Sequence, residues 1–178
     1  KMTGISMKSS FFGTIDNFYI SEIIMPFVKY FFNKRIELQV EAELEKYPQY
    51  TILRNIKNGI NSQIEIALIN ALAEGHIFLE ISGETALFVL SQIPEAREYI
   101  QAKYTHIFID EYQDCGNIQH EIFMKMISMG LLGIAVGDID QAIYAFANRY
   151  SKYLSELTQN KKFQNFRISK NHRCHESI

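Results

Sequence analysis

HIFIDEYQD, residues 106–114, is the stretch of sequence that decides the fold. Its apolar part, 107–109, has the β-branched and aromatic composition of a buried parallel strand. Two adjacent carboxylates, Asp110 and Glu111, follow directly at the end of that strand. Burying a carboxylate is costly unless it is paired or binds a metal. The stretch therefore predicts a strand end where one acid holds Mg²⁺ and the other accepts a proton from an attacking water. The alternative is a solvent-exposed pair of acids in a loop.

The sequence on both sides of this stretch predicts an α/β core. We expect alternating strands and helices at 105–110, 118–129, 132–136, 150–159 and 163–168. This order implies right-handed crossovers in a parallel sheet, and the carboxyl ends of its strands would form the ligand-binding edge.

The part of the chain before this core predicts helices almost throughout. We expect a short strand over 9–15 and then a helix capped by Asp16. Pro26 should either kink that helix or start a new one. Further helices are expected at 36–46, from 61 or 62 to Gly75, at 83–93 and at 94–104. Residues 1–31 and 105–178 would then form the α/β core, and residues 32–104 a helical insertion.

Composition places few limits on function. The chain has 178 residues, 47% of them hydrophobic and 21% charged, which is typical of a soluble globular domain. No apolar run is long enough to span a membrane. Two cysteines, Cys115 and Cys174, make no disulfide framework and favour a reducing cytoplasm. The spacing of His and Cys over 172–175 fits no common zinc site, so we expect no structural zinc.

Four further groups of residues have both a chemical and a structural interpretation. Gln141 follows the strand at 132–136 and can bond a phosphate oxygen or a water, although the GDIDQ string taken alone is better explained as a capped turn that starts a helix. Tyr144 and Phe146 can stack on unpaired bases or fill a core. Arg173 can reach a γ-phosphate or lie on the surface. The cations after residue 149 form either a solvated end or a phosphate-facing surface.

The chain contains no G-x-x-x-x-G-K-[ST] phosphate-binding loop. The acids can hold Mg²⁺, but the residues that would bind the phosphates of a nucleotide are missing. We therefore expect an internal fragment of a longer protein, and we expect the 178-residue chain alone not to hydrolyse ATP.

Taken together, four strings resemble the motifs of superfamily 1 helicases of the UvrD/Rep type. They are GTIDNF (13–18), the Walker B-like IFIDEYQD (107–114), the motif III-like GDIDQAIYAF (137–146) and NHR (171–173), which resembles motif IV. The resemblance implies a partial RecA-like P-loop NTPase sheet with a helical insertion of the 1B kind. It also implies an ATP- and Mg²⁺-dependent DNA helicase or translocase that moves on single-stranded DNA, with duplex DNA as a further partner, and a role such as DNA repair.

The resemblance assigns roles to single residues. Asp110 would bind Mg²⁺ and Glu111 would be the general base. Gln141 would sense the γ-phosphate and couple it to DNA, and Arg173 would be an arginine finger. The residues near DNA would be Thr14, Tyr144 and Phe146.

Two positions depart from the family pattern. Asp16 stands where the family usually has His, and Ala147 where it usually has Arg. They motivate an alternative, a nucleotide-gated DNA-binding or interaction module without unwinding activity. A metal-dependent nuclease site is a third hypothesis, but it leaves Gln113, Gln141 and Arg173 without a role. The sequence leaves open the pathway, the polarity of movement and the oligomeric state.

Overall fold

The computed structural model describes residues 10–32, 36–139 and 152–168. The chain divides into two compact units. The first unit comprises residues 1–108 and 117–134, and the second comprises 109–116 and 135–178. The domain boundaries expected from the sequence, at 31/32 and 104/105, stay a prediction.

The first unit begins with a continuous helical segment whose helix type changes along its length. It consists of α1 (Ile15–Phe18), a π-helix (Tyr19–Ile24), α2 (Met25–Phe27) and a 3₁₀ turn (Val28–Tyr30). The expected helix is confirmed, but its N-cap is Thr14, whose Oγ1 accepts from the Asn17 N–H at 3.3 Å, and not Asp16. The expected strand over 9–15 is wrong across its described part, because residues 10–14 form no strand and Ile15 is already helical.

A short parallel strand pair follows, which was not predicted from the sequence. β1 (Gln39–Glu41) pairs with β2 (His76–Phe78), with Gln39 opposite His76. The expected helix over 36–46 is therefore wrong, because pairing with β2 outweighs the helix propensity of this segment. Gly75 adopts a φ of +94°, and a Cβ there would collide with the Glu37 carbonyl oxygen, so this turn into β2 requires glycine.

Three of the predicted helices are confirmed between residues 60 and 104. They are α3 (Ser62–Ala73), α4 (Ser82–Gln92) and α5 (Pro94–Lys103). Asn61 caps α3, since its Oδ1 accepts from the backbone N–H groups of Gln63 and Ile64, both at 3.0 Å. A 3₁₀ helix over Pro48–Asn58 was not predicted.

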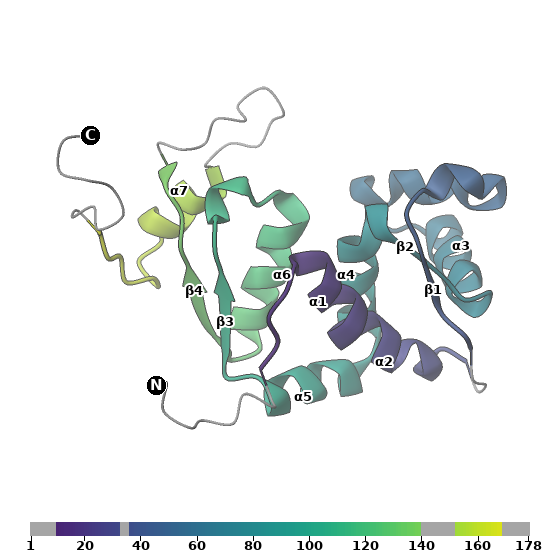
Figure 1. The fold of residues 1–178 in the computed structure, drawn as a ribbon, viewed down its shortest axis with the longest axis horizontal. Helices are drawn as coiled ribbons and strands as arrows, with labels where there is room; N and C mark the ends of the chain where they lie inside the picture. The colour runs from purple at the N-terminus through teal and green to yellow at the C-terminus, as the bar shows by residue number, and fades with distance from the viewer. Residues whose placement is uncertain (1–9, 33–35, 140–151, 169–178) are drawn as a thin grey trace. The chain divides into compact units, whose positions relative to one another are not determined.

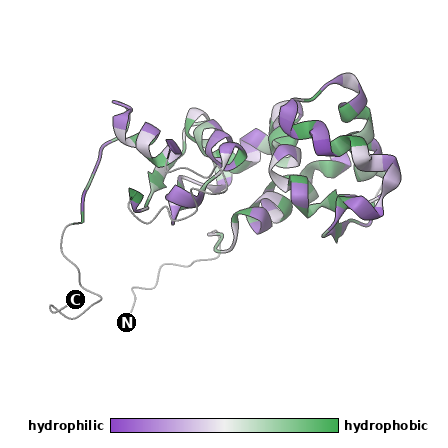
Figure 2. Cartoon of the chain, turned by 90° about the horizontal axis from the view of Figure 1, so that it is seen from above, coloured by the Kyte–Doolittle hydropathy of each residue, from purple (hydrophilic) through white to green (hydrophobic). Residues whose placement is uncertain are grey.

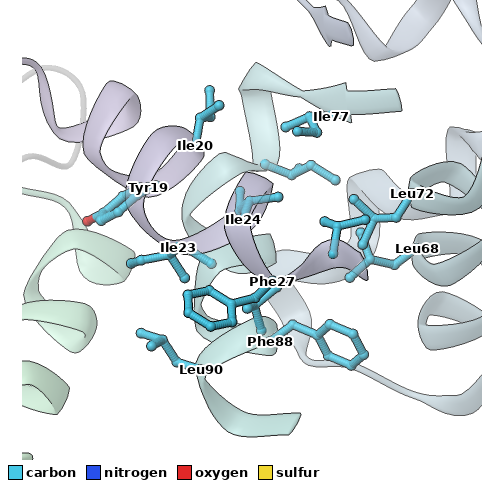
Figure 3. Close-up of a cluster of buried hydrophobic side chains, with 14 of the residues drawn as sticks. Tyr19, Ile20, Ile23, Ile24, Phe27, Leu68, Leu72, Ile77, Phe88 and Leu90 are labelled. Atoms are coloured by element: carbon cyan, nitrogen blue, oxygen red, sulfur yellow. The ribbon is translucent and has the colours of Figure 1, made fainter. Parts of the chain in front are cut away.

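A buried apolar cluster holds the first unit together. The close-up in Figure 3 shows side chains from the π-helix, α2, α3, β2 and α4 packed against one another, among them Tyr19, Ile20, Ile23, Ile24, Phe27, Leu68, Leu72, Ile77, Phe88 and Leu90. The helices of this unit carry hydrophobic and hydrophilic residues side by side (Figure 2), as helices with one buried face do.

An ion pair ties the π-helix of the first unit to α5. Lys103 Nζ lies 2.5 Å from Glu22 Oε2 and also donates to the Tyr99 hydroxyl at 2.8 Å. Burial alone would raise the pKa of Glu22, but the hydrogen bond and charge of Lys103 outweigh it, so the pKa lies below its usual 4.5. The ionised form is therefore stabilised by folding.

This ion pair predicts a pH-dependent stability. Because the pKa of Glu22 is lower in the folded state, its contribution is complete above about 4.5 and is lost as the pH falls through the folded value. We expect Glu22→Gln to lower the free energy of unfolding at pH 7 by about 1.5–3 kcal/mol. In urea unfolding at several pH values, the difference from wild type should shrink below pH 4.5. The control is Glu98→Gln, at an exposed position of α5; an equal loss in both variants would contradict the assignment.

The predicted strand–helix–strand arrangement of β3 (His106–Ile109), α6 (Asn117–Ser128) and β4 (Leu132–Ala135) is confirmed. β3 and β4 form a two-stranded sheet (Figure 1). The Leu132 N–H donates to the Thr105 carbonyl and the Val136 N–H to the Ile109 carbonyl, both at 2.9 Å. Both bonds join residues with the same sequence separation, which makes the strands parallel.

The expectation that β3 is buried is wrong for most of its length. Only Ile109 is buried, whereas Phe108 is 60% exposed. The reason is that β3 pairs with β4 alone among the described residues, so that much of its surface stays uncovered.

The second unit contains a 3₁₀ turn (Tyr112–Asp114) and α7 (Lys152–Gln159). The helix expected at 150–159 is confirmed over its described part. The strand expected at 163–168 is wrong: these residues form no strand, and Phe166 and Ile168 are 84% and 86% exposed. A strand needs a neighbour for its backbone groups, and no described segment pairs with this one.

Membrane spans were sought in the described residues, and no helix there is long and apolar enough to cross a bilayer.

Candidate functional site

The candidate site lies in the second unit, where the chain leaves β3 and β4. Beyond the last strand bond, the Tyr112 N–H donates to the Val136 carbonyl at 2.8 Å. This bond fastens the residues that follow β3 to those that follow β4. As the sequence predicts, DEYQD and the start of GDIDQ therefore lie together at the carboxyl edge of the sheet.

Glu111 makes the turn at the end of β3. It adopts the left-handed conformation, with φ +52° and ψ +44°, the only non-glycine residue with positive φ in the described part of the chain. This conformation costs about 1–3 kcal/mol at such positions. The bond from Tyr112 to Val136 and a bond of 2.9 Å from the Asp114 N–H to the Glu111 carbonyl oppose that cost. Nothing in the sequence indicates this turn.

Asp110 and Glu111 are both exposed, so the costly burial expected for these carboxylates does not occur. Asp110 Oδ1 accepts from the Glu111 N–H at 3.0 Å. The Glu111 carboxylate accepts from the Gln113 side chain, whose Nε2 lies 2.6 Å from Oε2. The two acids thus differ in surroundings: Asp110 is held by backbone, and Glu111 by a side chain.

Gln113 joins the two halves of the site. Its side chain is only 3% exposed. Besides donating to Glu111, it accepts from the Asp138 backbone N–H, with Oε1 at 3.0 Å. The sequence analysis did not predict that Gln113 would link the two strand ends. The feature that could have suggested it is an uncharged amide placed two residues after the acid pair Asp110–Glu111.

Gly137 gives Gln113 the space that it occupies. A Cβ at residue 137 would collide with Gln113 Oε1, and it would lie 3.0 Å from Leu154 Cδ2 and 3.1 Å from the Tyr112 nitrogen. Glycine is required here for close approach of the backbone. This requirement was not predicted from the sequence.

Two residues of the segment that follows β3, Tyr112 and Cys115, are buried. Tyr112 is fully buried, and burial raises the pKa of its hydroxyl. Burial also raises the pKa of the Cys115 thiol to about 11, which keeps it protonated at neutral pH. Both residues are structural.

Among the described residues, no group of three or more His, Cys, Asp or Glu side chains could hold a metal ion by itself. Mg²⁺ does not require such a group. Proteins commonly bind it through one or two carboxylates, while waters and phosphate oxygens complete its coordination shell. The exposed Asp110 carboxylate fits that pattern.

The roles of the other predicted site residues stay predictions. Gln141, Tyr144, Phe146 and Arg173 lie outside the described residues. Thr14 belongs to the first unit, where it is exposed and caps α1.

Asp16, which departs from the family pattern, has structural partners within the first unit. Its Oδ1 accepts from the Ser82 hydroxyl at 2.7 Å. Burial raises the pKa of the neighbouring Glu84, and the charge of Asp16 raises it further, although Lys57 lowers it. Asp16 therefore anchors α1 to the start of α4 and adds negative charge there.

Comparison with known proteins gives the family. The model of the UvrD/REP helicase N-terminal domain matches residues 29–162, more than half of the chain. The chain belongs to this family, and its helices and parallel strands are those of a partial RecA-like α/β domain. The resemblance seen in the sequence is confirmed.

Three curated relatives illustrate the range of the family. The chain is 29% identical to the Gabija protein GajB of Bacillus cereus (strain VD045) over 98% of its own length and 35% of that protein. It is 32% identical to an ATP-dependent helicase/nuclease of Streptococcus sanguinis (strain SK36), over 46% of the chain and 8% of that protein. For the exonuclease/helicase protein RexA of Streptococcus pneumoniae serotype 4 (strain TIGR4), identity is 35% over 46% of the chain and 7% of that protein. The chain thus spans about a third of the first relative's length and less than a tenth of the other two.

Proposed function

We propose that this chain is the central part of an ATP-dependent DNA helicase that couples ATP hydrolysis to movement on single-stranded DNA. The observation that carries the proposal is the joined pair of strand ends, where Gln113 links Glu111 of DEYQD to Asp138 of GDIDQ. Membership of the helicase family supports it, as do the names of the ATP-dependent helicase/nuclease relatives.

Asp110 and Glu111 carry the chemistry in this proposal. Asp110 would hold Mg²⁺, which neutralises charge on the triphosphate when bound. Glu111 would take a proton from the attacking water through the carboxylate that Gln113 holds. The different hydrogen-bond partners of Asp110 and Glu111 suit these two different roles, metal binding and proton transfer.

The remaining roles rest on the motifs. Gln141 and Arg173 would contact the γ-phosphate, and Thr14, Tyr144 and Phe146 would contact DNA. The phosphate-binding loop is absent from this sequence, so we expect the 178-residue chain alone not to hydrolyse ATP. A cytoplasmic location and a role in DNA repair also remain predictions.

The Mg²⁺ role of Asp110 can be tested in the full-length protein. Asp110→Ala removes the one carboxylate assigned to the ion, so we expect DNA-stimulated ATP hydrolysis to fall at least about 100-fold. The rate is measured against Mg²⁺ concentration, and any residual activity should require more Mg²⁺. The control Glu121→Ala removes an exposed carboxylate of α6. Activity of Asp110→Ala at the wild-type rate and Mg²⁺ requirement would remove Asp110 from the site.

A second function is favoured by the surroundings of Asp16. Its carboxylate is engaged by Ser82 and adds negative charge beside Glu84, which disfavours contact with a DNA phosphate. The full-length protein would then be a nucleotide-gated binding module that hydrolyses ATP without unwinding. A strand-separation assay decides: hydrolysis without separation of strands supports the module, and unwinding excludes it.

A further inference from the structure

The side chain of Gln113 is held at both ends inside the second unit. It is 3% exposed, and its amide donates to Glu111 Oε2 at 2.6 Å and accepts from the Asp138 N–H at 3.0 Å. Because a buried amide without partners is costly, these two bonds allow this residue type to lie here.

The chemistry of the partners fixes the orientation of the amide. The Asp138 backbone N–H can only donate, so it requires the Gln113 oxygen. An ionised carboxylate can only accept, so Glu111 requires the nitrogen. Turning the amide over would break both bonds at once. A glutamate in place of Gln113 could satisfy Asp138 but could not donate to an ionised Glu111.

The space around the amide is equally restrictive. Gly137 lies against Gln113 Oε1 so closely that a Cβ would collide with it. The backbone segment 137–138 and the Glu111 carboxylate are therefore connected through a single side chain. If either end moves, the other must move or lose its bond.

We infer that Gln113 is a positioning residue that sets the place of the Glu111 carboxylate and couples it to the segment 137–138, which precedes Gln141 in the sequence. The inference rests on the proposed function, in which Glu111 is the general base. It adds a physical link by which a change at the start of the GDIDQ string reaches the water-activating group. Gln113 itself contacts no reacting atom.

The kinetic test uses full-length Gln113→Glu and Gly137→Ala. Gln113→Glu keeps an acceptor for Asp138 but removes the donor to Glu111. Gly137→Ala displaces the Gln113 amide without changing its chemistry.

Because misplacing a catalytic group by about 1 Å costs on the order of 100-fold, we expect kcat to fall about 10- to 100-fold in each variant. The KM for ATP should stay within about threefold, because neither residue is assigned to ATP binding. Because a loss of folded protein would also lower the apparent kcat at constant KM, kcat is expressed per folded molecule, with the folded fraction measured by circular dichroism and urea unfolding. The double variant should be little worse than the single ones, since both break the same link.

The structural test uses the 178-residue chain and does not depend on catalysis. In Gln113→Ala the Asp138 N–H loses its acceptor, so its hydrogen exchange should accelerate at least about tenfold. The matched control is Gln101→Ala, which removes another glutamine bond, from Nε2 to the Met129 carbonyl in the first unit, and should leave Asp138 unchanged.

The outcomes separate the inference from the function beneath it. Two results would overturn the inference alone. One is a wild-type protein that hydrolyses ATP and a Gln113→Glu variant with the same kcat. The other is unchanged hydrogen exchange at Asp138 in Gln113→Ala. A wild-type full-length protein that hydrolyses no ATP would remove the proposed function, and the inferred role in positioning a base would fall with it. Lower kcat at constant KM together with faster exchange at Asp138 would support the inference.

Discussion

Glu111→Gln in the full-length protein is expected to lower the kcat of DNA-stimulated ATP hydrolysis by about 10²–10⁴-fold, the contribution usual for a positioned general base. Glutamine keeps the length of the side chain but cannot take a proton from water. ATP binding should persist, because Asp110 and the phosphate contacts are unchanged. Steady-state hydrolysis and equilibrium binding of a fluorescent ATP analogue measure the two effects.

The control for this variant is Glu121→Gln, which removes an exposed charge from α6 in the first unit. It should leave kcat within about twofold of wild type, since surface substitutions of this kind have small effects. If Glu111→Gln retained more than about a tenth of the wild-type kcat, Glu111 would not be the general base.

Ile64→Ala is expected to lower the free energy of unfolding of the first unit by about 2–5 kcal/mol. The Ile64 side chain is 3% exposed and belongs to the buried cluster, so its removal loses apolar burial and leaves a cavity. Ile66, two residues further along α3, is 60% exposed. Ile66→Ala makes the same chemical change on the same helix and should cost less than about 0.5 kcal/mol.

Urea unfolding followed by circular dichroism measures both isoleucine variants. Equal losses of stability would contradict the burial of one face of α3. A larger loss for Ile66→Ala would indicate that the exposed face of this helix is covered in solution.

Long periodic helices and the strand–helix–strand order could be predicted from the sequence. α3 begins after Asn61 and α5 begins at Pro94, because a cap and an N1 proline are local signals. The Asp110–Glu111 pair was placed correctly at a strand end, because an apolar run that stops at two acids is also a local pattern.

Features that depend on distant residues could not be predicted in this way. β1 looked helical by composition, and only its pairing with β2 makes it a strand. The exposure of Phe108 depends on what covers β3, which the local pattern does not record. The left-handed turn at Glu111 and the Gln113 link depend on contacts with residues 136–138, which lie one helix and one strand further along the chain.

The central claim is that these residues build the Mg²⁺- and water-handling half of an ATP-driven DNA motor. The most direct measurement is the rate of ATP hydrolysis by the full-length protein, with Mg²⁺, in the presence and absence of single-stranded DNA. We expect hydrolysis that DNA stimulates and that depends on Asp110 and Glu111. Absence of hydrolysis with DNA present, or hydrolysis that survives replacement of both acids, would contradict the claim.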